Sequence, residues 1–219
     1  MHRILFEKTD DAIWISHLDV MRIFQRAFLR EHIPIAHTQG FSPHAFVSVL
    51  LPLSVGTQSH CELLECKLED NTIGFEEIAA RLNRTLPAGI RVLQVYESGR
   101  KAKELVFLKA QVWLEYDAGV APDAAEKLNA LFQSPTLTVE KRSKKGTSQV
   151  DIIPMLKKLE VRQEGEDCLV LDCVVCAQNP SLNPMLLAAA IETYLPELGP
   201  DFAWCCRLEV LDAAGETFR

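Results

Sequence analysis

The sequence has no run of apolar residues that approaches the roughly 18 needed for a membrane-spanning helix. Its first residues, MHRILFEKTD, are charged and strand-like, and they lack the apolar core of a signal peptide. The seven cysteines are an odd number in a chain of 219 residues, and they do not form the framework of a small disulfide-rich domain. We therefore expect a reduced, cytoplasmic protein with no membrane partner.

The sequence also lacks the short motifs of several large enzyme classes. None of the patterns G-x-x-x-x-G-K, G-x-G-x-x-G, H-E-x-x-H and G-x-S-x-G occurs in it. These absences argue against an NTPase, a dinucleotide-dependent enzyme, a zinc hydrolase and a serine hydrolase. We expect no metal and no cofactor. Whether the protein is an enzyme stays open, and the sequence favours a binding protein.

Charge is distributed unevenly along the chain. The formal net charge is -7, from 23 Lys and Arg against 30 Asp and Glu. Residues 1–103 carry 12 cations and 12 acids, whereas residues 104–219 carry 11 and 18, so the whole deficit lies in the second half. An acidic balance argues against coating nucleic acid through bulk charge, but it permits a local site in the neutral first half.

Apolar periodicity predicts the order β-α-β-β-α-β in each half of the chain. Ser16 and Asp19 form an S-x-x-D capping pattern that starts the first helix. A polar segment near residues 98–103 separates the halves. We predict an α+β fold of two tandem ferredoxin-like (βαββαβ) units with antiparallel sheets. They comprise residues 1–99 and 104–219, the second with a sheet strand at 136–143 and an inserted basic loop at 141–158.

The cysteines of the second half raise the question of a metal cluster. Cys168, Cys173 and Cys176 match part of the plant-type iron–sulfur spacing. They lie, however, in an apolar strand, where side chains alternate and Cys173 and Cys176 point to opposite faces. We interpret them as small buried apolar residues.

Two basic clusters are candidate phosphate-binding sites, because Arg binds phosphate through two parallel hydrogen bonds. A stripe with a spacing of four residues lies on the first predicted helix, and a second cluster lies in the inserted loop. The alternatives are a solvated helix face, partly paired with Asp19 and Glu31, and a solvated hairpin tip. The stripe consists of Arg22, Arg26 and Arg30, and the loop cluster of Lys141, Arg142, Lys144 and Lys145.

Three histidines are candidate catalytic residues. His17 lies in the first turn of the predicted helix, where the helix dipole disfavours an added positive charge, so a neutral imidazole could act as a base. The alternative is that His17 only fixes the start of the helix. His37 and His44 flank the segment HTQGFSPHAFVS, in which Gly40 and Pro43 predict a turn.

This turn places His37, Phe41 and His44 near one end of the Arg-lined helix. We expect this segment to be mainly a structural turn that also borders a functional surface. Phe41 is expected to be packed rather than stacked on a base.

The N-terminal motifs together resemble the uncharacterised radical SAM-linked protein family. The matching segments are Ser16–Asp19, the Arg-bearing helix, Gln39–Pro43, Pro52–Gly56 and Glu62–Leu68, and weaker matches extend along the chain. The loop marker of this resemblance consists of Gln39, Gly40, Phe41 and Pro43. This sequence departs from the pattern after Pro43, where His44, Ala45 and Phe46 replace basic residues. The resemblance implies a radical SAM protein as a partner in trans, in a bacterial setting of RNA processing.

Three hypotheses follow. The first is an accessory protein that acts with a separate radical SAM protein in RNA binding or RNA maturation. The second is a metal-independent endoribonuclease, by analogy with the tandem ferredoxin-like CRISPR repeat-processing (RAMP-like) enzymes, with His17 as base and His37 or His44 as acid. The third is a pure protein-interaction scaffold. The sequence does not determine the RNA, the partner's reaction or the oligomeric state.

Overall fold

The structure, a computed structural model, describes residues 1–69, 72–143 and 146–219. The chain forms two compact units, Met1–Ala102 together with Arg219, and Lys103–Phe218. Each unit combines α-helices with antiparallel strands, which confirms the predicted α+β class. Within the described ranges, no helix is both long and apolar enough to cross a membrane.

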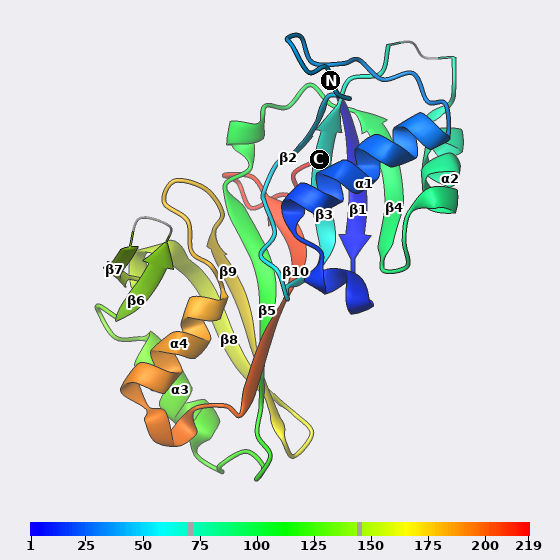
Figure 1. Cartoon of the computed structure of the whole chain (residues 1–219). Coiled ribbons are helices and arrows are strands. Elements are labelled where there is room, and N and C mark those ends of the chain that lie inside the picture. Colours follow the sequence, from blue (N-terminus) through cyan, green and yellow to red (C-terminus); the bar gives the residue numbers. More distant parts are fainter. Residues whose placement is uncertain (70–71, 144–145) are drawn as a thin grey trace. The chain divides into compact units, whose positions relative to one another are not determined.

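The first unit has an antiparallel sheet in the order β4-β1-β3-β2 (Figure 1). In the register of this sheet, Ile4 on β1 lies opposite Leu64 on β3 and Val95 on β4. The elements are β1 (His2–Lys8), η1 (Asp10–Trp14), α1 (His17–Arg30), β2 (Val47–Val49), β3 (Gln58–Cys66), α2 (Phe75–Thr85) and β4 (Ile90–Glu97).

Helices α1 and α2 cover one face of this sheet and enclose the core of the first unit (Figure 1). Strand residues alternate between faces, so every second side chain of β1 and β3 points toward the helices. The buried apolar residues of this layer include Ile4 and Phe6 from β1, Leu64 and Cys66 from β3, Phe24 and Phe28 from α1, and Ile78 and Leu82 from α2.

Both ends of α1 are stabilised by capping interactions. At the start, Ser16 accepts a hydrogen bond from the backbone N–H of Asp19 (3.3 Å), which confirms the predicted cap. At the end, the N–H of Ile33 bonds to the carbonyl of Phe28 (3.0 Å), and the N–H of His32 bonds to that of Leu29 (3.2 Å). This pair is a Schellman motif, and it places His32 in the left-handed region at φ 50°.

The second unit has an antiparallel sheet in the order β10-β5-β9-β8. Helix α3 contacts β8, and α4 contacts β5 and β10. The elements are η2 (Ala102–Glu104), β5 (Phe107–Glu115), α3 (Ala124–Phe132), β6 (Thr138–Ser143), β7 (Gly146–Asp151), η3 (Ile153–Met155), β8 (Leu156–Glu164), β9 (Cys168–Cys176), α4 (Met185–Tyr194), η4 (Pro196–Leu198) and β10 (Phe202–Leu211).

The predicted sheet strand at 136–143 does form, but it does not join the sheet of the second unit. It becomes β6, which pairs with β7 in a separate two-stranded sheet. The following segment, GTSQV, offers a nearby extended partner, and local pairing costs less chain entropy than pairing with a distant strand. The Tyr194 hydroxyl on α4 accepts a hydrogen bond from the N–H of Thr138 (3.2 Å) and donates one to its carbonyl (2.9 Å).

The prediction that residues 141–158 form an inserted basic loop is therefore wrong in its secondary structure. Its described residues belong to the β6–β7 hairpin, to η3 and to the start of β8. The described residues 146–149 are exposed on β7, as expected for a strand that lies outside a core. Polar residues can form such a two-stranded hairpin when one end is anchored, which Tyr194 and buried Val139 provide here.

Candidate nucleic-acid interface

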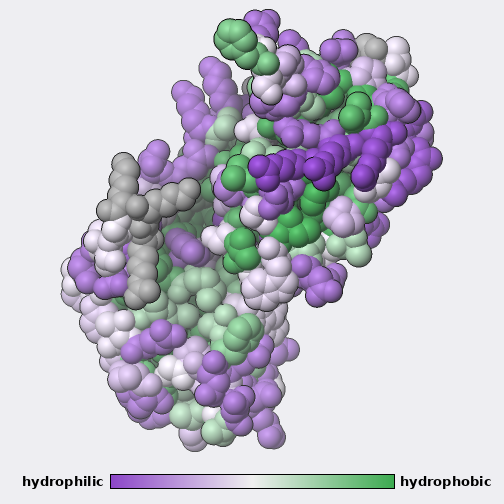
Figure 2. Space-filling view, in the orientation of Figure 1, coloured by the Kyte–Doolittle hydropathy of each residue, from purple (hydrophilic) through white to green (hydrophobic). Residues whose placement is uncertain are grey.

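A groove of about 580 Å³ lies beside the C-terminal half of α1 in the first unit. One wall of the groove is the helix α1. The other wall is the segment after the helix, which includes the Schellman turn and part of the predicted loop. Figure 2 shows a largely hydrophilic surface over α1. The lining residues are Arg22, Gln25, Arg26, Phe28, Leu29, His32, Ile33, Pro34, Ile35, His37, Pro43, His44, Ala45 and Glu69.

The groove contains two of the three predicted arginines. Arg22 lies 2.9 Å from Asp19 in an exposed ion pair, and the hydrogen bonds from Ser16 and then Arg22 lower the pKa of the Asp19 carboxyl. Arg26 is exposed and forms no ion pair within 4.0 Å in the part of the chain that the structure describes, although its charge also contributes to lowering the pKa of the Asp19 carboxyl. Arg30 is also exposed but does not line the groove. Glu31 pairs with Arg84 (3.2 Å) rather than with the stripe.

Three imidazoles line the same groove. His37 and His44 were predicted as site residues, and His32 was not. The sign that could have identified His32 is its place directly after the helix, where Gly is the usual residue. A non-glycine residue in the left-handed region costs of order 1 kcal/mol, and such strained residues cluster at functional sites. Among the described lining residues, Glu69 is the one acid.

The loop after α1 is fixed by hydrogen bonds to itself and to the helix. The N–H of Thr38 bonds to the carbonyl of His44 (2.8 Å), and the Thr38 hydroxyl accepts from the N–H of His44 (3.2 Å). His44 Nδ1 lies 3.1 Å from the carbonyl of Ser42. The Gln25 amide on α1 donates to the carbonyl of Ala45 (3.2 Å). The loop therefore holds its residues in a defined position beside the helix.

Phe41 contradicts the prediction that it packs. Its side chain is fully exposed at the tip of this loop, next to Gly40, whose φ is 131°. The physical reason is that the Thr38–His44 hydrogen bonds close the loop below the tip, so the tip residues have no core to reach. The exposed ring is not part of the groove lining, but it lies on the same loop as the lining residues Pro43 and His44 and is available for stacking.

His17 does not share the groove with the other predicted histidines. It lies half-buried in the first turn of α1, in a small cavity of about 10 Å³ that Lys8 and Glu62 also line. Among the described residues, no hydrogen bond joins His17 to His37 or His44. The structure therefore does not assemble the acid–base pair on which the endoribonuclease alternative depends.

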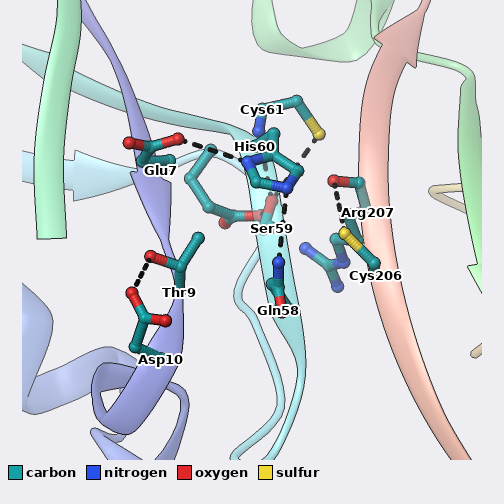
Figure 3. Close-up of polar contacts among 10 residues, drawn as sticks. Glu7, Thr9, Asp10, Gln58, Ser59, His60, Cys61, Cys206 and Arg207 are labelled. Carbon is teal, nitrogen blue, oxygen red and sulfur yellow. Dashed lines mark hydrogen bonds and ion pairs between the residues drawn. The ribbon is translucent and has the colours of Figure 1, made fainter. Parts of the chain in front are cut away.

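Neighbouring polar side chains on β3 satisfy one another. Figure 3 shows His60 between Glu7 and Gln58, with its Nδ1 3.2 Å from the Glu7 carboxylate and its Nε2 3.3 Å from the Gln58 amide. The Ser59 hydroxyl donates to the buried carboxylate of Glu62 (2.7 Å). These contacts give the polar side chains a structural role in the sheet.

The second predicted basic cluster lies in the second unit. Lys141 is half-buried on β6, and Arg142 follows it on the same strand. Lys144 and Lys145 lie outside the described residues. The prediction that this cluster contacts nucleic acid stays a prediction.

The cysteines are buried, as predicted for small apolar residues. Burial raises the pKa of the Cys173 and Cys205 thiols to about 12, so these thiols stay protonated at neutral pH. In the described ranges, no group of three or more His, Cys, Asp and Glu residues is placed to hold a metal ion.

One protein family matches most of this chain. The family model DUF2344, described as an uncharacterized protein conserved in bacteria, matches residues 2–184. The chain belongs to this family. The description of DUF2344 names no radical SAM protein. No curated protein matches the sequence.

Solved structures resemble this DUF2344 protein at low sequence identity. One, titled as the crystal structure of a Cbf5-Nop10-Gar1 complex, matches with a TM-score of 0.53 and 10% identity over 95% of this chain and 48% of the other. Another, an archaeal box H/ACA sRNP Nop10-Cbf5 complex, has a TM-score of 0.48 and 10% identity over 94% and 46%. The chain spans about half the length of these structures, and at this identity the first match shows the fold alone.

Proposed function

We propose that this protein binds RNA through the groove beside α1 and acts as an accessory protein of a separate radical SAM protein. The observation that carries the RNA part is the composition of the groove. Arg22, Arg26 and three imidazoles line one cavity, and the guanidinium of Arg26 is in no ion pair with a described carboxylate. Such a guanidinium is available to bind a phosphate through two hydrogen bonds.

The charge distribution is compatible with this proposal. The whole chain is acidic, but residues 1–103, which contain the groove, are neutral in formal charge. Binding would therefore rest on a few local contacts and weaken with salt in proportion to their number, because each phosphate contact releases condensed counterions. Glu69 in the groove would repel a phosphate placed beside it. It therefore favours a path of the RNA along the side of the groove that Arg22 and Arg26 line.

We further propose that both units are ferredoxin-like. In each, the elements follow one another as β-α-β-β-α-β apart from the β6–β7 hairpin. In each, the sheet order by sequence is fourth, first, third, second strand. The consequence for function is that α1 lies on the covered face of its sheet and directs its arginines away from the core.

Replacing Arg26 by Gln is expected to weaken binding of a single-stranded RNA about tenfold at low salt, because it removes one charged contact. The slope of log K against log salt should fall by about 0.7, the contribution of one phosphate contact to a single strand. Fluorescence anisotropy with a labelled oligonucleotide, titrated at several salt concentrations, measures both quantities.

Arg30→Gln is the matched control, since Arg30 is exposed on the same helix but outside the groove. It should leave the affinity within about twofold of the parent. Equal losses of RNA affinity in the two variants would show that the overall charge of the helix attracts RNA and that the groove is not a specific site. A parent protein that binds no RNA at low salt would reject the RNA part of the proposal.

The radical SAM partnership is supported by the resemblance of the N-terminal motifs and by an apolar surface at the other end of α1. Trp14 is 65% exposed, and its ring lies against Gly56, next to exposed Val55. Leu18, one turn further along, is 50% exposed. Clustered exposed apolar residues of this kind are typical of a protein-binding surface.

Affinity capture from nuclease-treated lysate should retain a protein with the C-x3-C-x2-C motif of radical SAM enzymes, and Trp14→Ala should lose it. Leu93→Ala, which changes an exposed apolar residue on β4, is the control that should retain it. Capture that requires intact RNA, or that survives Trp14→Ala, would contradict this assignment.

A further inference from the structure

We propose that Phe41 is a base-stacking residue that makes the groove selective for single-stranded over double-stranded RNA. This inference rests on the proposed RNA-binding function and names its substrate class. It starts from one side chain whose exposure the sequence did not predict. Single exposed apolar residues are common on protein surfaces, so exposure alone carries no argument. The argument depends on how the loop presents this ring and on what lies next to it.

The loop is built to hold the ring outward. The Thr38–His44 hydrogen bonds and the bridge between His37 and Ala45 close it at its base. Gly40 at φ 131° makes the turn just before Phe41, in a region of backbone space that other residues rarely adopt. Nothing lies within 4 Å of the position that a side chain on Gly40 would take, so the tip is open on that side as well.

Phe41 is not itself a lining residue of the groove, but residues close to it in sequence are. Pro43 and His44, two and three residues after Phe41, line the groove together with Arg22 and Arg26. Leu29, which is 75% exposed, adds an apolar surface to the same groove. An exposed ring for the base and cations for the phosphate are the features with which proteins hold single strands.

The same chemistry disfavours a duplex. Paired bases are stacked on their neighbours and present their edges rather than their faces, so an exposed ring can stack only on an unpaired base. Stacking accepts any base because every base has an aromatic face. The groove should therefore select a strand state, and it should show little preference for sequence.

The test uses the 219-residue chain with a labelled single-stranded RNA, the same strand annealed to its complement, and a strand with abasic positions. Phe41→Ala should weaken single-strand binding about tenfold or more, while the duplex and the abasic strand change less than twofold. Phe41→Tyr should restore binding, because it keeps the ring. The salt slope should stay at the parent value, since no phosphate contact is removed.

Two controls separate stacking from damage to the fold. Phe41 has no buried contact to lose, so the free energy of unfolding of Phe41→Ala should lie within about 0.5 kcal/mol of that of the parent. Phe202→Ala changes another exposed phenylalanine, 58% exposed in the second unit, and should leave RNA binding unchanged.

The outcomes distinguish this inference from the proposed function. A parent that binds no RNA overturns both. A parent that binds RNA with the Arg26 dependence given above, but equally in the Phe41→Ala variant, overturns the stacking inference and leaves the RNA function standing. Loss of a captured protein in Phe41→Ala with unchanged RNA affinity would assign the ring to a protein contact and also overturn the inference.

Discussion

Replacing Phe24 by Ala is expected to lower the free energy of unfolding by about 3–5 kcal/mol, the usual cost of removing a buried phenylalanine. Phe24 is fully buried between α1 and the sheet of the first unit. Its ring meets that of Phe6 edge to face, with ring centroids 5.0 Å apart and an angle of 63° between the planes. Ala would leave a cavity and remove this aromatic contact, which adds about 1 kcal/mol beyond burial.

The loss should also reach the groove, because Phe24 lies on the buried side of the helix that presents Arg22 and Arg26 on its other side. A helix that packs less firmly holds its arginines less firmly, so RNA affinity should fall although no contact to RNA is removed. Phe24→Leu, which keeps most of the apolar volume, should cost about 1–2 kcal/mol and leave binding close to the parent.

Urea denaturation monitored by circular dichroism measures the stability of these variants, and anisotropy measures their RNA binding. A Phe24→Ala protein with parental stability would show that α1 is not held to the sheet by this contact. A protein of low stability with parental RNA affinity would show that the groove does not depend on the packing of α1.

Replacing Arg3 by Met is expected to destabilise the first unit by about 3 kcal/mol, since breaking a partly buried ion pair leaves the Glu65 carboxylate uncompensated and removes the other hydrogen bonds of the guanidinium. Arg3 on β1 is 1% exposed, yet it carries a full charge. Its guanidinium donates to the Glu65 carboxylate on β3 (2.9 Å), to the Ser98 hydroxyl after β4 (2.9 Å) and to the carbonyl of Arg100. One side chain thus joins the central strand to both of its neighbours and to the segment that leaves the sheet.

Arg3→Lys keeps the charge but loses the planar fork that reaches several acceptors at once, so it should fall between Met and the parent. Arg162→Met is the matched control in the second unit. Arg162 is 36% exposed and pairs with Asp172 (2.8 Å), and exposed pairs contribute about 0–1 kcal/mol.

Adding Glu65→Leu to Arg3→Met should recover part of the lost stability, because it removes the carboxylate that the first change left without its cation. Chemical denaturation of the single and double variants gives this coupling energy. Arg3→Met at parental stability would mean that the cost of burying the guanidinium cancels its hydrogen bonds.

The sequence by itself determined the local structure of this protein. Ser16 and Asp19 set the start of α1 because an N-cap satisfies backbone groups only a few residues away. The spacing of Phe24 and Phe28 set its buried face, and the apolar run CLVLDCVVC identified a strand with buried cysteines. These features depend on neighbours along the chain, so a reading of the chain can find them.

The tertiary structure alone decided which of the candidate residues meet. All three arginines of the stripe are exposed on one helix, yet only Arg22 and Arg26 line the groove, since the chain leaves α1 at His32 and returns past Gln25. His17 and His44 were equal candidates by residue type, and they line different cavities because His17 lies in the first turn of α1 whereas His44 lies in the loop that follows the helix.

Phe41 and the strand β6 show the same limit. An apolar ring is normally expected in a core, but the hydrogen bonds between Thr38 and His44 close the loop and leave the tip in solvent. The segment 138–143 has the pattern of a sheet strand, and the pattern does not name its partner, which proved to be β7. Contacts between residues distant in sequence are set by the packing of whole elements, and for that reason the groove, the place of His32 in it and the exposure of Phe41 emerge only in three dimensions.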